Sequence, residues 1–135
     1  MKKLASILGV ILLLTVMSCE TTTDDPPAPV EDYTIKYSVV STGDVVVDTI
    51  MYMDKDGVEQ YVFGQINFEH SFVAPSNNYS GKFYISGKII NGSCKYDLSV
   101  LDKDGGIISL KGSESSSTSE YNFSYSAIIS NTSTK

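Results

Sequence analysis

The sequence predicts an all-β protein whose folded part is an antiparallel β-sandwich. Apolar and polar residues alternate with a period of two along most of the chain after residue 32. β-Branched and aromatic residues dominate these stretches, and Asp, Asn, Gly and Pro separate them at short, roughly regular intervals. No stretch carries apolar residues at helical spacing over enough residues to predict a helix.

The first half of the folded part contains four expected strands. Tyr33 to Val39 alternates strictly, and the third strand places Tyr61 and Phe63 on one side. Asp54-Lys55-Asp56-Gly57 predicts a turn, because Asp and Gly favour the tight turns of hairpins. The expected strands cover residues 33–39, 45–53, 58–64 and 67–74.

The second half repeats this organisation. Asn91-Gly92 predicts one turn, residues 102–106 predict another, and the serine-rich segment 112–119 predicts a loop. The expected strands cover residues 82–90, 94–101, 107–111 and 121–129. Seven to eight short antiparallel strands of this kind are typical of an immunoglobulin-like β-sandwich.

The N-terminal segment has the pattern of a secretory leader. Lys2 and Lys3 precede an apolar run over residues 4–16, which is shorter than the roughly 20 residues of a spanning helix. The run ends in Val-Met-Ser-Cys, which resembles the lipobox of bacterial lipoproteins. We therefore expect cleavage between Ser18 and Cys19 and lipidation of Cys19. The alternatives are an uncleaved anchor and a plain signal peptide followed by a free cysteine.

These features divide the chain into four parts: a signal peptide (1–18), the lipidated cysteine with a disordered tether rich in Thr, Asp and Pro (19–32), the β-sandwich (33–130) and a polar tail (131–135). Glu20 stands where an aspartate would signal inner-membrane retention, so the outer membrane is the expected location. Acidic residues after the cysteine resemble the surface-export signal of Bacteroidota lipoproteins. Both the periplasmic leaflet and the cell surface remain open.

Composition excludes some partners. Removal of 18 residues leaves 117 of the 135, and the loss of Lys2 and Lys3 changes the net charge from −6 to −8. The chain has no arginine. A nucleic-acid partner is not expected, because phosphate recognition requires a basic surface. The expected membrane contact is the lipid. With Cys19 acylated, Cys94 has no partner within the chain, so it is either buried in the core or paired between chains.

The candidate chemical groups do not form a catalytic set. The two Asp-Lys-Asp-Gly segments, 54–57 and 102–105, are either turns or fragments of calcium loops, which need six to eight oxygen ligands. His70, the single histidine, shares a predicted strand face with Phe68 and Phe72. No nucleophile with a neighbouring base is recognisable. We therefore expect no enzymatic activity, no metal and no cofactor.

The tyrosines are the remaining candidates for a binding role. The chain has nine tyrosines and no tryptophan. Most are expected at core or half-buried strand positions. The alternative is an exposed aromatic face for a sugar or peptide, because amphipathic aromatic side chains suit interfaces.

Four segments in order resemble the extracytoplasmic domain of the MmpS family, accessory proteins of mycobacterial lipid and siderophore exporters: Tyr37–Gly43, Ile50–Gly57, Phe68–Pro75 and Gly92–Leu98. The resemblance covers about residues 33–125 and implies a seven-stranded immunoglobulin-like sandwich. Phe68 stands where the family has Trp. The family's second cysteine, which the resemblance would pair with Cys94, is absent. The family is anchored by a helix and not by a lipid.

Together these features predict a non-enzymatic lipoprotein of the cell envelope. Its expected role is to bind another envelope protein, with a transport component as a candidate. The alternative is a surface-exposed module that binds a glycan or a host ligand.

Overall fold

The computed structural model describes residues 32–76 and 78–130. The predicted signal peptide, the Ser18–Cys19 site, most of the tether and the tail 131–135 lie outside the described residues. The described chain is all-β and antiparallel, as predicted, and contains no helix and therefore none able to cross a membrane. Its strands are β1 (Thr34–Met53), β2 (Glu59–Phe63), β3 (Asn67–Val73), β4 (Ser80–Leu101), β5 (Ile107–Ser117) and β6 (Tyr121–Ser130).

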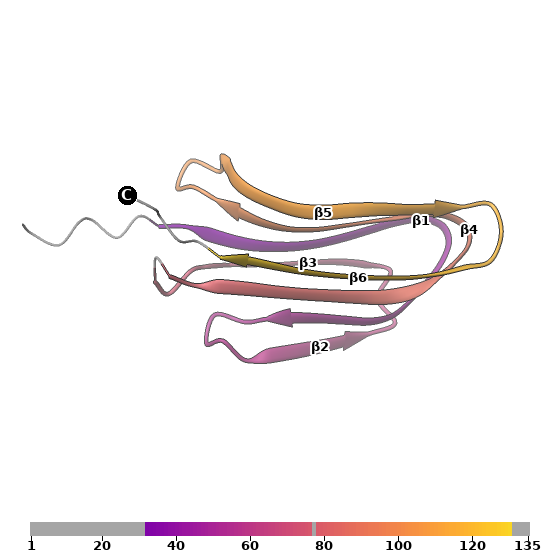
Figure 1. The fold of residues 1–135 in the computed structure, drawn as a ribbon, viewed down its shortest axis with the longest axis horizontal. Coiled ribbons are helices and arrows are strands. Elements are labelled where there is room, and N and C mark those ends of the chain that lie inside the picture. Colours follow the sequence, from indigo (N-terminus) through magenta and orange to yellow (C-terminus); the bar gives the residue numbers. More distant parts are fainter. Residues whose placement is uncertain (1–31, 77, 131–135) are drawn as a thin grey trace, which may run out of the picture.

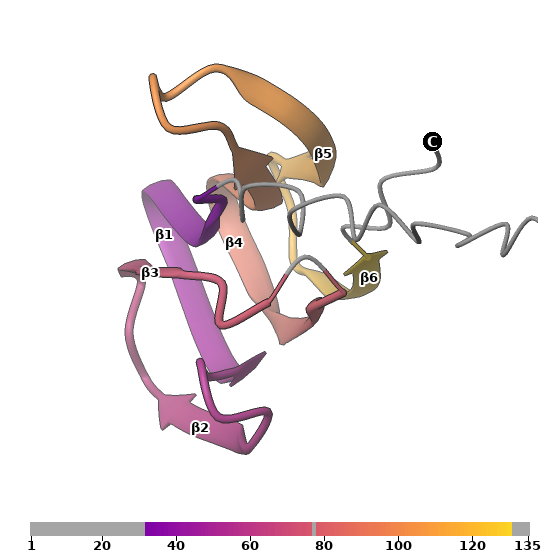
Figure 2. The same cartoon turned by 90° about the vertical axis from the view of Figure 1, so that its left-hand side faces the viewer.

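Two long strands, β1 and β4, form the centre of the sheet and pair with each other along most of their length. Both turn back midway, so each contributes two arms (Figure 1). The first arm of β1 and the second arm of β4 lie between β3 and β5. The other two arms lie between β2 and β6. The sheet therefore forms two layers, seen end-on in Figure 2.

The bend is built from two facing glycines, Gly43 of β1 and Gly92 of β4. Gly43 has a φ of 78°, and a Cβ there would collide with the carbonyl oxygen of Asn91. The register shifts next to this pair, between Asp44 and Val45, which increases the local bending.

The prediction of a turn at Asn91-Gly92 is therefore wrong. Asn-Gly commonly closes a hairpin, but here both residues stay paired with β1 and the strand continues through them. Residues 82–90 and 94–101, expected as separate strands, are the two arms of β4, and residues 33–39 and 45–53 are the arms of β1. Residues 32–76 and 78–130 thus form six strands, two of which pass through both layers.

The serine-rich loop expected over 112–119 is also wrong for most of its length. β5 continues to Ser117, and its residues 112–117 pair with residues 92–97 of β4. The hydrogen bonds between neighbouring strands are made by backbone N–H and C=O groups, so a run of serines can form them as well as apolar residues can. The hydroxyls of Ser115 and Tyr96 add a hydrogen bond of 2.8 Å beneath this segment.

The core lies between the two layers. Tyr37 on the first arm of β1 is fully buried, and its ring centroid lies 5.8 Å from that of Phe83 on the first arm of β4. At the other side, Tyr96 of β4 stacks on Phe123 of β6 with centroids 5.9 Å apart. These ring pairs join one layer to the other, because each brings together residues from opposite layers.

Candidate binding face

Strand β2 exposes its aromatic side chains, although large apolar side chains of a strand usually face the core. Gln60 and Val62 point inward and are half-buried, whereas Tyr61 and Phe63 are 55% and 67% exposed. The inward Gln60 is satisfied, because its Nε2 donates to Oδ2 of Asp54 at 2.7 Å. Two large aromatic side chains therefore remain exposed to solvent, although the opposite facing of the strand would bury them.

The sheet register places further apolar side chains beside these two. Met51 of β1 lies opposite Tyr61 on one side and opposite Tyr84 of β4 on the other. Their chain neighbours Ile50 and Ile85 are fully buried, so Met51 and Tyr84 point outward. We call Met51, Tyr61, Phe63 and Tyr84 the aromatic face.

The surroundings of the aromatic face are polar. The ion pair between Lys82 Nζ and Glu59 Oε1, at 3.6 Å, lies at one end. The hydroxyl of Tyr61 donates to Glu59 Oε2 at 3.1 Å, and this bond to a carboxylate raises the pKa of Tyr61. Hydroxyl side chains continue the same rows of the sheet at Thr49, Ser86, Ser124 and Ser126. An apolar centre with a polar rim is the usual anatomy of a protein interface.

The hairpin that carries β2 is tied to the core. The hydroxyl of Tyr37 donates to the carbonyl oxygen of Met53 at 2.8 Å. The hydroxyl of Tyr79 donates to the carbonyl oxygens of Met53 and Asp54. Burial raises the pKa of both tyrosines, so both hydroxyls remain donors at neutral pH. The end of β1 and the start of the turn that leads into β2 are therefore tied to the core.

The two Asp-Lys-Asp-Gly segments are turns, as predicted. In the first, Asp54 Oδ1 accepts hydrogen bonds from the N–H groups of Asp56 and Val58 at 3.0 and 2.9 Å. In the second, the Oδ1 atom of Asp102 accepts from the corresponding N–H groups of Asp104 and Gly106 at 2.9 and 2.7 Å. Among the described residues, no three His, Cys, Asp or Glu side chains gather as metal ligands.

His70 lies on the inner face of β3 with Phe68 and Phe72, as the alternation predicts. Its ring centroid is 4.7 Å from that of Tyr52 and 5.7 Å from that of Phe72. The side chain is half-buried within an aromatic cluster, and its ring contacts are those of a packing residue.

Cys94 is fully buried, which confirms the first of the two expectations for its position. Its sulfur accepts a hydrogen bond from Ser41 Oγ at 3.3 Å. Burial raises the pKa of the thiol, which keeps it protonated. A buried protonated thiol is a poor nucleophile and a poor partner for a second chain.

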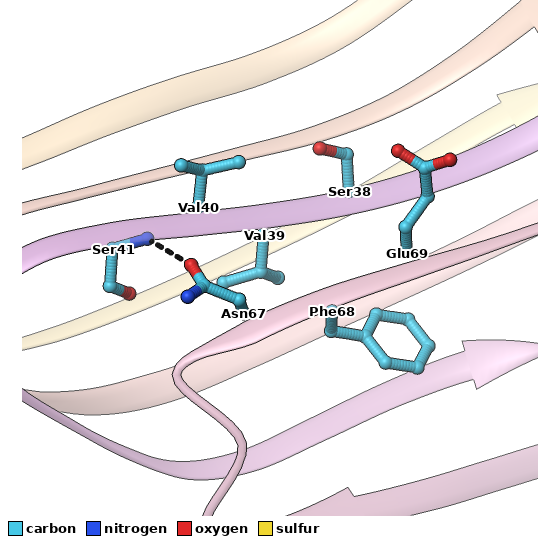
Figure 3. Close-up of a pocket in the computed structure, with 7 residues that line it drawn as sticks. All are labelled: Ser38, Val39, Val40, Ser41, Asn67, Phe68 and Glu69. Carbon is cyan, nitrogen blue, oxygen red and sulfur yellow. Dashed lines mark hydrogen bonds between the residues drawn. The ribbon is translucent and has the colours of Figure 1, made fainter.

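A hollow of about 500 Å³ lies on the other layer, where β3 begins beside β1 (Figure 3). Asn67 Oδ1 accepts from the backbone N–H of Ser41 at 3.0 Å and so extends the ladder by one bond. Glu69 at its rim is paired with Lys36 at 2.9 Å. Its lining has one titratable side chain, which is already paired, and lacks a catalytic set.

The alternation of β2 predicts that Tyr61 and Phe63 share a side, which the structure confirms, but it does not tell which side meets water. The available signal is Gln60, which follows the Asp54 turn closely enough to reach its carboxylate. Met51 and Tyr84 join the face through pairing between distant strands. A scan against protein-family models and a search of curated proteins both find no match.

Proposed function

We propose that this protein is a non-enzymatic lipoprotein of the cell envelope whose folded domain binds another envelope protein through the aromatic face. The observation that carries the proposal is the inverted strand β2, which exposes Tyr61 and Phe63 and turns Gln60 inward. Exposing two aromatic side chains costs burial free energy, roughly 1.5–3 kcal/mol for each large apolar side chain. Such a cost is offset when a partner covers them.

The composition of the face favours a protein partner over a glycan. Tyr, Phe and Met are enriched where proteins meet, and a few such side chains usually supply most of the binding free energy. The neighbouring hydroxyls and the Glu59–Lys82 ion pair form a rim that can exchange hydrogen bonds with a partner. Tyr61 and Tyr84 also suit stacking on a sugar ring, which keeps glycan binding as the alternative for the experiment below.

The location follows from the leader. Lipidation at Cys19 would hold the domain at the membrane, most simply at the outer membrane, and residues 19–32 would separate the two. Two layers that share a core agree with an immunoglobulin-like sandwich, in which the four arms and the four flanking strands take the place of seven to eight strands. The resemblance to MmpS proteins makes a transport component the first candidate partner.

The binding proposal is tested by crosslinking in the cell that makes the protein. A photo-crosslinking amino acid replaces Tyr84 in the intact lipoprotein, and the products are identified by mass spectrometry. We expect a stoichiometric envelope protein, and we expect Tyr61→Ala and Phe63→Ala each to reduce its capture at least tenfold. Val73→Ala is the matched control, because Val73 is an equally exposed apolar residue on the other layer.

Equal melting temperatures of the three variants would show that they remain folded. Unchanged capture by Tyr61→Ala and Phe63→Ala would refute the assignment of the face. If folded, lipidated protein yields no protein partner but is retained on envelope glycan through Tyr61, the alternative replaces the proposal.

The anchor is tested separately with Cys19→Ala. Loss of the acylated cysteine should release the protein from the membrane fraction or leave the longer precursor, because stable anchoring needs two or more acyl chains. Wild-type mobility and membrane fractionation in this variant would disprove lipidation without bearing on the aromatic face.

A further inference from the structure

Each layer of the sheet ends in two flanking strands, and within the described residues β2, β3, β5 and β6 each have one edge without a strand partner. Such an edge offers unpaired backbone N–H and C=O groups to any other strand, and proteins usually protect it with charges, bulges or short length. Three of the four edges carry one of these protections.

β2 is only five residues long and begins with Glu59. β3 carries Glu69, which is paired with Lys36. β5 carries Lys111 and Glu114, and its pairing with β4 is interrupted by a register shift between Val100 and Leu101. Each of these edges therefore resists the addition of a further strand.

β6 has none of these protections. Its ten residues, Tyr121–Ser130, include no charged side chain and no proline. Its pairing with β4 runs through ten successive partners without a register shift, so the outer edge is regular as well. Ile128 is 63% exposed beside it. A long, regular and uncharged edge is the surface that adds another strand most readily.

We propose that the edge of β6 pairs with the β6 edge of a second copy of this chain, antiparallel about a two-fold axis. The argument for a second copy is electrostatic. The chain has a net charge of −6, so two copies repel one another at most surfaces. A two-fold axis on β6 places β6 residues directly opposite β6 residues, and none of these is charged.

The pleat restricts the register of this pair. Phe123, Ala127 and Ile129 are buried on the inner side, so inner residues must lie opposite inner residues. The registers that satisfy this condition and use most of the strand centre on Tyr125 or on Ser126. In both, Ser124, Ser126 and Ile128 of each copy lie on the outer side near the axis. Each copy would contribute the layer that contains β2 and β6, and these two layers would join through β6 into one continuous sheet.

The first test measures the mass of the full chain in detergent over a concentration series. We expect the protein mass to double as the concentration rises, and we expect Ser126→Lys to weaken the association at least tenfold because it places two like charges near the axis. Ser116→Lys is the matched control, since Ser116 is an exposed serine on the protected strand β5. A single-chain mass at every concentration, or equal loss with Ser116→Lys, would overturn the proposal.

The second test crosslinks Ser126→Cys in membranes with a short bis-maleimide, which reaches between the two cysteines in either register. Homodimeric product is expected, and it should persist when Tyr61→Ala is added, because the pairing does not use the aromatic face. The chain without an added cysteine shows any background from Cys19, and Cys94 is buried. A product that contains a different protein in place of the second copy would refute the proposal.

Discussion

The two Asp-Lys-Asp-Gly hairpins have the same sequence and the same internal hydrogen bonds but different surroundings. In both, Gly57 or Gly105 takes a positive φ of 77° or 83° and donates to the carbonyl of the leading aspartate at 3.0 Å. The first hairpin is also held by Tyr79, by Tyr37 and by Gln60. The second hairpin joins β4 to β5, and the carboxylate of Asp102 accepts hydrogen bonds from the N–H groups of Asp104 and Gly106.

This difference separates local from tertiary stabilisation. Five residues, from the leading aspartate to Val58 or Gly106, are sufficient to form each turn, because the hydrogen bonds of the turn lie within them. The position of the turn relative to the core needs donors from elsewhere in the chain, and for the first hairpin the buried tyrosines Tyr37 and Tyr79 supply them. That hairpin leads into β2, which carries Tyr61 and Phe63 of the aromatic face. Fixing its position preorganises the face, and preorganisation lowers the free-energy cost of binding a partner.

The largest expected loss of stability comes from removing the tertiary contacts of the first hairpin. Tyr79→Ala removes a buried ring packed edge-on against Phe72 and both hydrogen bonds to the first hairpin, and should lower the free energy of unfolding by about 3–5 kcal/mol. Urea unfolding measures this. Tyr79→Phe keeps the ring and should cost only about 1 kcal/mol. If the two variants were equally destabilised, the ring would contribute nothing beyond the hydroxyl.

The glycines test the local side. A Cβ at either Gly57 or Gly105 meets no atom within 4 Å, so only the left-handed backbone is strained. Gly57→Ala and Gly105→Ala should each cost roughly 1–2 kcal/mol, and the two values should agree. Thermal unfolding of both variants checks this. A much larger cost at Gly57 would mean that the first turn is not locally equivalent to the second.

A smaller difference is expected between the aspartates. Asp54→Ala removes the acceptor for two N–H groups of the turn and for Gln60, whereas Asp102→Ala removes only the acceptor for two N–H groups. Both should lower the melting temperature by a few degrees, with the larger decrease for Asp54→Ala. Hydrogen exchange of the Gly57 and Gly105 amides would show whether each effect stays in its own hairpin.

The smallest effect is a dependence on pH. The Val58 N–H, with help from Gln60 and Asp56, holds the pKa of Asp54 below its ordinary value. The charged carboxylate therefore stabilises the fold above the unfolded pKa of about 3.9, and this contribution is lost as the pH falls through the lower folded value. The difference in melting temperature between wild type and Asp54→Ala should be constant from about pH 7 to 5 and shrink below about pH 4. A difference that grew on acidification would contradict this assignment.

Much of the strand content was predictable because alternation is local. β3 and β6 lie within a residue of their expected bounds, and the burial of Cys94 follows from its strand face. The continuity of β4 through Gly92 was not predictable, because an Asn-Gly pair is equally suited to a turn. The facing Gly43 decides between the two, and it lies far away in the chain.

The sequence by itself determined the β class, the two aspartate turns and the shared side of Tyr61 and Phe63, since each depends on neighbours within a few residues. Only the tertiary structure decided that this side faces water, that β1 and β4 bend instead of ending, and that β6 keeps an unprotected edge. These outcomes depend on which strands pair and which layer covers them. Strand pairing joins residues that are distant in sequence, and the local pattern of a strand does not specify which other strand it pairs with.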